Sequence, residues 1–470
     1  MPTNKWDLYI KEFGKIKEAN ISVTPFMIFV GKNNSGKSYL MLLLWGILSE
    51  SRSLIQKYID EYRGFNELLT KFTNQFNESD SNTIILNEED QDKLLEAYNQ
   101  MLRDQQDSLL KKVFRFPINI RELVIKRDNQ IPFKLGVKHS IRSVKRKEIN
   151  EDSKDASIQI YHGTKELLEA VYINPDPEGV VRFFLRYSLT LMITEGFYND
   201  PFSYNQDKQP LYLPASRTGF MHTYRAIVGN LFESSMSENI LVNEREDSAN
   251  QKINGTELTY PVIQFLSKLQ RHSFDDQNMK VFQEEIDFLN QELLSGEVQK
   301  DESNMFRFRP LDSEIAYPMH ITSSLVAEIA PITIFLSSNT NPDLWIIEEI
   351  ESHLHSEMQL KMARFLFRLL NKQKSVWITT HSDNLAQQIN NLLTLSQHPK
   401  RDDILSKLQY SSKDVLDDVT IVNAYQFSLE DGFTTIKSLP LNEYGFVMET
   451  FNDTLVDLVK ITDYIQNYSE

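Results

Sequence analysis

The sequence predicts an α/β fold, with strands and helices alternating near both ends of the chain and a mixed α and β segment between them. Three short apolar runs carry this prediction: Phe26 to Val30, Leu344 to Ile347, and residues 375–380. Each run has the length of a strand covered on both faces, and each leads directly into polar residues. A helical pattern follows the first run from Ser38 to Leu48. We therefore expect the three runs to be buried strands of one core.

The length and composition indicate a large folded protein. A chain of 470 residues can hold two or three structural units. Hydrophobic residues make up 41% and charged residues 25%, both ordinary values for globular proteins. There is no cysteine, which excludes disulfides, iron–sulfur clusters and thiolate zinc sites. The N-terminus lacks the layout of a signal peptide, so we expect a cytoplasmic protein.

Two strongly apolar helical stretches raise the question of a membrane. The stretch 39–48 is too short to cross a bilayer, and the stretch 180–198 carries Arg182 and Arg186. We expect both stretches to be buried core helices and expect no membrane partner.

The net charge of −16 means that the surface as a whole should repel nucleic acid. A DNA contact is therefore expected only at a local patch. The best candidate is residues 133–147, a β-like region that contains Lys134, Lys138, Arg142, Lys145, Arg146 and Lys147. A solvated, charged hairpin is the simpler interpretation of this cluster.

The remaining elements follow from local patterns. Asn87 can cap a helix that runs through 88–114, and strands are expected after it. Residues 210–220 read as a buried strand that ends in a turn, and two helices without heptad repeats follow. The stretch 419–439 predicts a hairpin with Asp431–Gly432 as its turn. An apolar helical face predicts a C-terminal helix, formed by Phe451, Leu455, Leu458, Val459 and Ile465.

The first apolar run leads into a phosphate-binding loop. Residues 31–38, GKNNSGKS, fit the pattern G-x-x-x-x-G-K-[ST] between a strand and a helix. Such a loop turns its backbone N–H groups inward, so that Lys37 can reach the β- and γ-phosphates and Ser38 can ligate Mg²⁺. We therefore predict a nucleotide site, with ATP and Mg²⁺ as cofactors, formed by Gly31, Asn33, Asn34, Ser35, Gly36, Lys37 and Ser38.

The second apolar run ends in two carboxylates. Glu348 and Glu349 directly follow the run 344–347. Adjacent residues at a strand end can face different parts of one site, so one carboxylate can hold the metal while the other orients or deprotonates water. We assign Glu348 to Mg²⁺ and Glu349 to the water.

The third apolar run ends at His381. A histidine at this position can contact the γ-phosphate and report its presence. A lone histidine after a strand is usually structural, but the two other motifs favour a catalytic role.

The three motifs GKNNSGKS, IIEEIESHLH and ITTHSD, in this order and separated by a long insertion, resemble those of the ATP-binding cassette ATPases of the OLD, RecF and SMC type. The stretch YLPASR (212–217) is also similar to OLD-like ATPases. Arg217, at the end of this strand, can lie near the nucleotide or a partner, but a structural salt bridge is the simpler interpretation. The resemblance implies an ABC-type P-loop head whose N- and C-terminal segments share one sheet, and head-to-head dimers that sandwich ATP.

With this resemblance the chain divides into four segments. Residues 1–50 are expected to form the N-terminal part of the head, and 51–205 a helical and β-rich insertion. Residues 206–304 would return a strand to the head and add helices, and 305–470 would complete the head.

The resemblance also implies a signature segment before the acidic strand, whose serine contacts the γ-phosphate held by the other subunit. The stretch HITSSLVAEIAPITIFL (320–336) lies at this place, with Ser323 or Ser324 as the donor and Ser324 preferred. Two positions depart from the family pattern: Leu325 replaces a common glycine, and Glu348 replaces the usual aspartate. The family's glutamine loop is expected in the insertion.

His353, His355 and Glu351 could be mistaken for zinc ligands. Their spacing does not place two histidines on one helical face, and the matching family segment contacts the opposite subunit. We do not expect a zinc site here.

The resemblance narrows the function further. OLD proteins carry a TOPRIM nuclease after the ATPase, but little more than a hairpin and a helix is expected after His381, so we expect no built-in nuclease. The chain then resembles the stand-alone OLD-like ATPases of bacterial anti-phage systems. The Septu ATPases (PtuA), which work with the HNH nuclease PtuB, come first, and the PARIS ATPases (AriA), with a TOPRIM effector, come next.

We therefore expect an ATP-hydrolysing regulatory or sensor subunit that controls a separate nuclease effector through ATP-dependent head dimers or higher oligomers. The alternative is a RecF-like DNA-repair ATPase that clamps DNA, for which the patch 133–147 would supply the contact. A third interpretation is a scaffold whose ATP site is only structural.

Overall fold

The computed structural model describes 6–78, 83–127, 131–146, 149–173, 176–194, 197, 209–223, 226, 258–303, 305–339, 341–443, 445–448 and 459–465. Only the backbone is described for 78, 138–146, 149–156, 170–173 and 420.

A nine-stranded sheet forms the centre of the molecule, in the order β5-β1-β2-β16-β15-β3-β14-β13-β9. Five adjacent strands of this sheet run parallel to one another: β15, β3, β14, β13 and β9. At the other edge, β1 pairs antiparallel with β2 and β5. The strands are β1 (Trp6–Phe13), β2 (Ile16–Val23), β3 (Phe26–Gly31), β5 (Glu122–Arg127), β9 (Leu211–Leu213), β13 (Leu344–Ile347), β14 (Ser375–Thr380), β15 (Val422–Glu430) and β16 (Phe433–Leu439).

This sheet is shared by the two ends of the chain. β3, from the N-terminal segment, lies between β14 and β15, which come from the C-terminal segment. The predicted α/β head, assembled from both ends of the chain, is therefore confirmed. The three apolar runs of the sequence are β3, β13 and β14, and every residue of these strands is buried.

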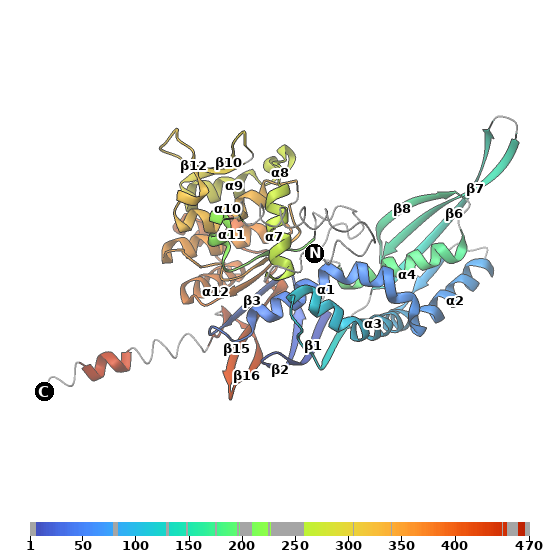
Figure 1. Cartoon of the computed structure of the whole chain (residues 1–470), viewed down its shortest axis with the longest axis horizontal. Helices are drawn as coiled ribbons and strands as arrows, with labels where there is room; N and C mark the ends of the chain where they lie inside the picture. Colours follow the sequence, from blue (N-terminus) through green and yellow to red (C-terminus); the bar gives the residue numbers. More distant parts are fainter. Residues whose placement is uncertain are drawn as a thin grey trace, which may run out of the picture.

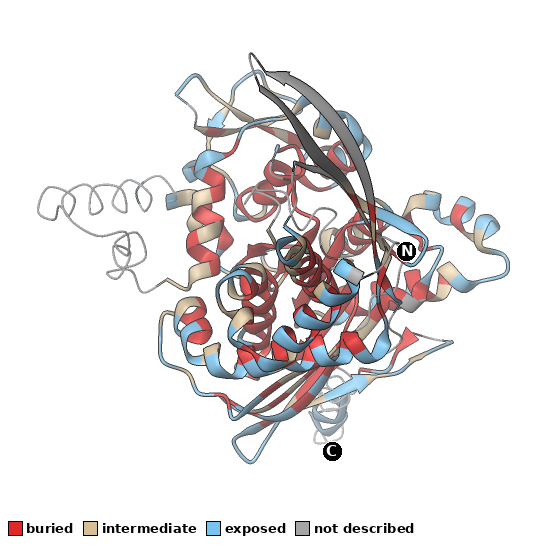
Figure 2. Cartoon of the chain, turned by 90° about the vertical axis from the view of Figure 1, so that its right-hand side faces the viewer, coloured by how far each residue is buried: buried red, intermediate tan, exposed pale blue. Residues whose placement is uncertain are grey.

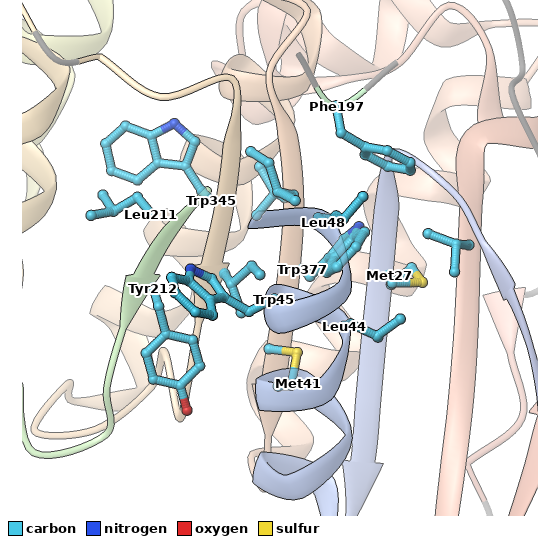
Figure 3. Packing of buried hydrophobic residues seen from close by; sticks show 14 of the residues in the cluster. Met27, Met41, Leu44, Trp45, Leu48, Phe197, Leu211, Tyr212, Trp345 and Trp377 are labelled. Atoms are coloured by element: carbon cyan, nitrogen blue, oxygen red, sulfur yellow. The ribbon is translucent and has the colours of Figure 1, made fainter. Parts of the chain in front are cut away.

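Helix α1 (Lys37–Tyr58) packs on one face of the parallel strands. Figure 3 shows Met41, Leu44, Trp45 and Leu48 of this helix among apolar side chains of the sheet. The Trp45 indole N–H donates to the Pro210 carbonyl at 3.1 Å, which ties the helix to the chain just before β9. The register of α1 on the sheet is thus fixed by packing and by a buried hydrogen bond.

The opposite face is covered by helices of the C-terminal segment. The Phe26 ring lies 6.1 Å from the ring of Phe367 in α11 (Ser356–Asn371). Figure 2 shows the resulting buried layers between the helices and the sheet. Other helices of this segment are α10 (Ser324–Leu336), α12 (Asp383–Gln397) and α13 (Arg401–Leu408), with 3-10 turns at Met319–Ile321, Ser412–Asp414 and Val419–Ile421.

The central segment builds a second, antiparallel sheet in the order β4-β6-β7-β8. β6 and β7 form a hairpin that projects from the body (Figure 1). The elements here are a 3-10 turn at Ile59–Glu61, α2 (Arg63–Glu78), β4 (Thr83–Leu86), α3 (Glu88–Phe114), β6 (Phe133–Arg146), β7 (Ile149–His162), β8 (Lys165–Ile173) and α4 (Pro177–Thr194).

The segment before the acidic strand adds helices and a small antiparallel sheet to the body (Figure 1). Its elements are α7 (Tyr260–Arg271), α8 (Asp276–Val281), α9 (Gln283–Phe288), the π-helical turn Leu289–Leu294, β10 (Gly296–Lys300), β11 (Phe306–Pro310) and β12 (Tyr317–Pro318). A further short pair, β17 (Leu441–Asn442) and β18 (Gly445–Phe446), follows β16.

Several local predictions are confirmed. Asn87 caps α3 by accepting from the Asp90 N–H. The two apolar stretches fall in α1 and α4 and are mostly buried there, although Tyr39 is exposed and 195, 196 and 198 of the second stretch lie outside the described residues. Asp431 and Gly432 both have positive φ, 50° and 83°, as the turn of the β15–β16 hairpin requires. No helix in the described part of the chain is long and apolar enough to span a membrane.

Some elements of the structure cross the segment boundaries expected from the sequence. Residue 50 lies inside α1, which continues to Tyr58, and β5 of the segment 51–205 joins the main sheet beside β1. The insertion therefore leaves and re-enters the head more than once.

Two expected features reach beyond the described residues. In the basic cluster, Lys134 is exposed on β6, and Lys147 lies outside the described residues. The side chains of the other four basic residues are not described: Lys138, Arg142, Lys145 and Arg146. Of the C-terminal helix, Phe451, Leu455 and Leu458 lie outside, whereas 459–465 is helical and exposed.

Candidate functional site

The phosphate-loop sequence adopts a tight turn between β3 and α1. Gly31 has φ 148°, and a Cβ at this position would collide with the carbonyl of Phe427 on β15. Gly36 has φ 88° and is the N-cap of α1, and Asn34 has φ 63°. Glycine and asparagine tolerate these conformations best. The loop therefore brings free backbone N–H groups at the start of α1 to one concave surface.

This surface belongs to a cavity of about 350 Å³. Residues 33–39 of the loop and helix form one wall, and residues 13–16, at the turn between β1 and β2, form another. Glu349, Thr379 and His381 complete the lining from the ends of β13 and β14. The volume lies within the range of small-molecule sites. The cavity therefore unites all three motifs recognised in the sequence.

Lys37 is the buried lysine of this cavity, only 5% exposed, whereas Lys15, which also lines it, is exposed. Its ammonium donates to the carbonyls of Gly31 and Lys32, each at 2.9 Å, and contacts Ser35 Oγ at 3.4 Å. Burial lowers the pKa of Lys37 to about 8, although the carboxylates of Glu349, Glu351 and Glu348 oppose this shift. The ammonium is thus held inside the loop curve, where phosphate oxygens can replace its carbonyl partners.

The lowered pKa of Lys37 predicts how ATP affinity depends on pH. Phosphates favour the charged ammonium, so ATP binding raises the pKa of Lys37. The affinity for ATP is therefore highest below pH 8, where the lysine is charged in the free protein, and declines as the pH rises above this value. We expect the Kd for ATP to increase by up to about tenfold per pH unit above that point. Calorimetric titrations from neutral to alkaline pH measure this. Lys37→Arg, which stays charged, should give a flat profile, and a flat wild-type profile would contradict the prediction.

Glu348 and Glu349 diverge at the end of β13. Glu348 is buried, and its Oε2 accepts from the Ala215 N–H at 3.4 Å. Glu349 turns into the cavity through a left-handed backbone conformation, φ 42°, which is uncommon for a residue with a side chain. Its N–H donates to Thr379 Oγ1 at 2.8 Å, and Ser352 Oγ donates to its carboxylate at 3.3 Å. The strained residue is the one whose carboxylate faces the cavity.

The two residues assigned to Mg²⁺ both carry oxygen donors, but only Ser38 lines the cavity. Glu348 lies outside this lining, and its Oε1 is buried without a hydrogen-bond partner. Carboxylate and hydroxyl oxygens are suitable Mg²⁺ ligands, and this ion takes its other ligands from water and substrate phosphates. Within the described residues, no group of three or more His, Cys, Asp or Glu side chains forms a metal cluster. The donor set therefore suits a metal that arrives with a nucleotide.

His381 faces Glu349 across the cavity. Its Nε2 lies 3.7 Å from Glu349 Oε1, and its backbone N–H donates to Glu351 Oε1 at 2.5 Å. Burial and the nearby Lys37 lower the pKa of the imidazole, so the ring is neutral near pH 7. Burial raises the pKa of the Glu351 carboxyl, and its Oε2 has no hydrogen-bond partner. Glu351 thus supports the backbone of His381.

Thr379 is a site residue that motif matching did not identify. It is buried on β14, lines the cavity, and accepts the N–H of Glu349 at its hydroxyl. The available signal was the pair Thr379-Thr380 at the end of an otherwise apolar strand, directly before His381. Buried hydroxyls need a partner, so a polar pair at a strand end indicates a bonded role.

Thr379→Val is expected to reduce catalysis by misplacing Glu349. The variant keeps the shape but leaves the Glu349 N–H without its acceptor, which costs about 1–3 kcal/mol. We expect kcat to fall about tenfold, with little change in the ATP Kd. Thr379→Ser keeps the hydroxyl and should retain turnover. Equal steady-state rates for the valine and serine variants would contradict this role.

The serines of the expected signature lie elsewhere. Ser323 is the N-cap of α10 and accepts from the Val326 N–H at 3.3 Å, and Ser324 is the first residue of that helix. Both are exposed, and neither lines the cavity. Arg217 does not line it either, and it forms a buried ion pair with Glu328, the role expected from sequence. One copy of the chain thus brings together the phosphate loop, Glu349 and His381, but not Ser323 or Ser324.

Comparison with known families decides the assignment. The model of the AAA ATPase domain family matches residues 7–386. The chain belongs to this family. The match spans the phosphate loop, both glutamates and His381. A comparison with curated protein sequences gives no match.

Solved structures that resemble this AAA ATPase are heads of Smc proteins. One is a SmcHead bound to the C-winged helix domain of ScpA, with 11% identity, a TM-score of 0.33, and coverage of 94% of this chain and 98% of that chain. Another is the SMC head domain from Thermotoga maritima, with 11% identity, a TM-score of 0.31, and coverage of 93% and 99%. A third, from Pyrococcus furiosus, is an Smc head with an extended coiled coil, with 11% identity, a TM-score of 0.31 and 98% coverage of both chains.

Proposed function

We propose that this chain hydrolyses ATP in a site completed by a second copy, and that the closed pair controls a separately encoded nuclease of an anti-phage defence system. One observation carries the first part. Lys37, Glu349 and His381 line one cavity, whereas Ser323 and Ser324 lie exposed outside it. The family resemblance assigns these serines to the γ-phosphate, and from their exposed position outside the cavity we propose that they reach it in another copy.

The cavity residues have complementary roles in this reaction. Lys37 and the N–H groups at the start of α1 bind the β- and γ-phosphates. Glu349 accepts a proton from the attacking water, a role that its position in the cavity lining, 3.7 Å from His381 Nε2, supports. The neutral His381 donates a hydrogen bond toward the γ-phosphate. Ser38 and Glu348 would hold Mg²⁺, which would neutralise charge on the phosphates.

ATP then links the two copies because each γ-phosphate contacts both. In the proposed closed pair, Ser324 of one copy donates to the γ-phosphate bound at Lys37 of the other. Hydrolysis removes this shared contact, so the free energy that holds the pair depends on the nucleotide. The exposed start of α10, with Ser323 and Ser324 side by side, supports this arrangement.

A mixing experiment tests the composite site. Lys37→Ala and Ser324→Arg chains should each be inactive alone, since each homodimer lacks one half of both sites. A mixed pair holds one intact site, so an equal mixture should recover about a quarter of wild-type phosphate release. As a control, Lys37→Ala mixed with Glu349→Gln should recover nothing, because both changes fall on the same half. No recovery in the first mixture would contradict a site shared between copies.

The effector is proposed to be an HNH nuclease, as in Septu systems, in preference to a TOPRIM protein, as in PARIS systems. The described C-terminal helix 459–465 supports a protein partner, because it exposes apolar side chains at Val459, Ile461, Tyr464 and Ile465. Co-expression with the proteins of neighbouring genes tests this proposal. Co-elution of an HNH protein, with nuclease activity that changes on ATP addition, is the expected result.

ATPase and DNA-binding assays distinguish the RecF-like alternative. ATPase activity stimulated by duplex DNA would favour a DNA clamp, provided that binding is sensitive to salt and is lost when Lys145, Arg146 and Lys147 are neutralised. ATP binding without turnover would favour a structural nucleotide site. Either result, without an associated nuclease, would overturn the effector proposal.

A further inference from the structure

Arg217 occupies an unusual position behind the acidic residues of the site. It follows β9 and is 1% exposed. Its guanidinium donates to the carbonyl oxygens of Glu348 at 2.5 Å, Glu349 at 3.2 Å and Pro214 at 3.2 Å. These three carbonyls belong to the ends of two adjacent strands. Arg217 therefore holds the backbone of both acidic residues without lining the cavity itself.

The same side chain also reaches helix α10. Its Nε donates to the Glu328 carbonyl at 3.3 Å, and its guanidinium forms an ion pair with the Glu328 carboxylate, which is also 1% exposed. Thr218 adds a second connection, because its hydroxyl lies 2.6 Å from Glu328 Oε2 and 3.4 Å from the Ser324 carbonyl. Arg217 and Thr218 thus connect the first two turns of α10 to the backbone of Glu349.

We propose that Arg217 is a positioning residue that couples the placement of Ser324, at the start of α10, to the placement of the Glu349 carboxylate. This proposal rests on the proposed function, because Ser324 must contact the second copy's nucleotide. A movement of the start of α10 on closure shifts Glu328, and Arg217 transmits the shift to the Glu348 and Glu349 carbonyls. The Glu349 backbone has φ 42°, so a small change there re-aims its carboxylate.

The chemistry of the side chain explains why arginine is needed. A guanidinium has five N–H donors in a rigid plane, which can serve several carbonyls and one carboxylate at the same time. An ammonium is a single point on a flexible stem and cannot span these acceptors. Arg217→Lys therefore keeps the charge beside Glu328 but loses the connection to the acidic residues.

The test must separate positioning from stability, since an unpaired buried Glu328 destabilises the fold. Replacing both partners of a buried ion pair by apolar residues restores stability in many proteins. We expect Arg217→Met with Glu328→Leu to unfold near the wild-type temperature, to bind ATP with unchanged Kd, and to have a kcat reduced about tenfold to 100-fold. Arg217→Lys should show the same loss of kcat at unchanged KM.

A second buried ion pair, at the start of β13, provides a matched control. Lys374 and Asp343 form a buried ion pair at 3.0 Å, before β14 and β13 begin. Lys374→Met with Asp343→Leu should match the first double variant in stability but retain wild-type kcat. Wild-type kcat in the Arg217 double variant would show that the pair is only structural and would overturn the proposal. Absence of turnover in the wild-type chain would instead overturn the proposed function.

Discussion

Glu349→Gln is expected to reduce ATP turnover by about 100-fold or more, because a glutamine amide cannot accept the proton of the attacking water. ATP binding should persist, since Lys37 and the phosphate loop are unchanged. Glutamine is close in size to glutamate and keeps the side chain in the cavity, so the fold should be unaffected. Phosphate release at saturating ATP, together with calorimetric ATP binding, measures both effects.

The position of the carboxylate provides the control. Glu357→Gln changes an exposed carboxylate in the first turn of α11, outside the cavity lining, and should leave turnover unchanged. Wild-type turnover in Glu349→Gln would remove the general-base role from this residue. Equal losses in both variants would indicate a general effect of charge.

Lys37→Ala is expected to weaken ATP binding by about 100-fold, because the ammonium supplies charge-assisted hydrogen bonds of about 1.5–3 kcal/mol each to the phosphates. The stability of the empty protein should change little, since the variant removes a buried charge together with its two carbonyl contacts. Fluorescence titration with a labelled ATP analogue and thermal unfolding measure the two quantities.

A neighbouring lysine in the same loop serves as the control for Lys37. Lys32 is exposed and outside the cavity lining, so Lys32→Ala should bind ATP as the wild type does. ATP binding by Lys37→Ala at wild-type affinity would place the nucleotide elsewhere, and a similar loss in Lys32→Ala would point to non-specific charge attraction.

The main elements of the site could be predicted because each motif follows a strand with a strong pattern. The runs before Gly31 and Glu348 are apolar and the run before His381 is largely so, which predicts buried strands, and buried strands of one sheet bring their ends together. The relative order of β3, β13 and β14 in the sheet had no local signal. The family resemblance implied only that both ends of the chain share one sheet, and the structure places β14 between β3 and β13.

The supporting residues were less predictable because their roles depend on distant partners. Thr379 contacts Glu349, and Arg217 contacts Glu328 across more than a hundred residues of sequence. No local spacing encodes such contacts. The pairing of β5 with β1 was missed for the same reason, since edge-strand pairing depends on what remains exposed after the core has formed.

Cysteine cross-linking tests most directly the claim that two copies share each site. Because the chain contains no cysteine, Asn33→Cys and Ser324→Cys each introduce a single thiol, one at the cavity and one at the start of α10. We would mix the two variants in a Glu349→Gln background, with and without ATP, and add a short thiol cross-linker. The account predicts a band of two 54.9 kDa chains that forms only with both variants and ATP present. No ATP-dependent band, with both thiols shown to be reactive, would contradict it.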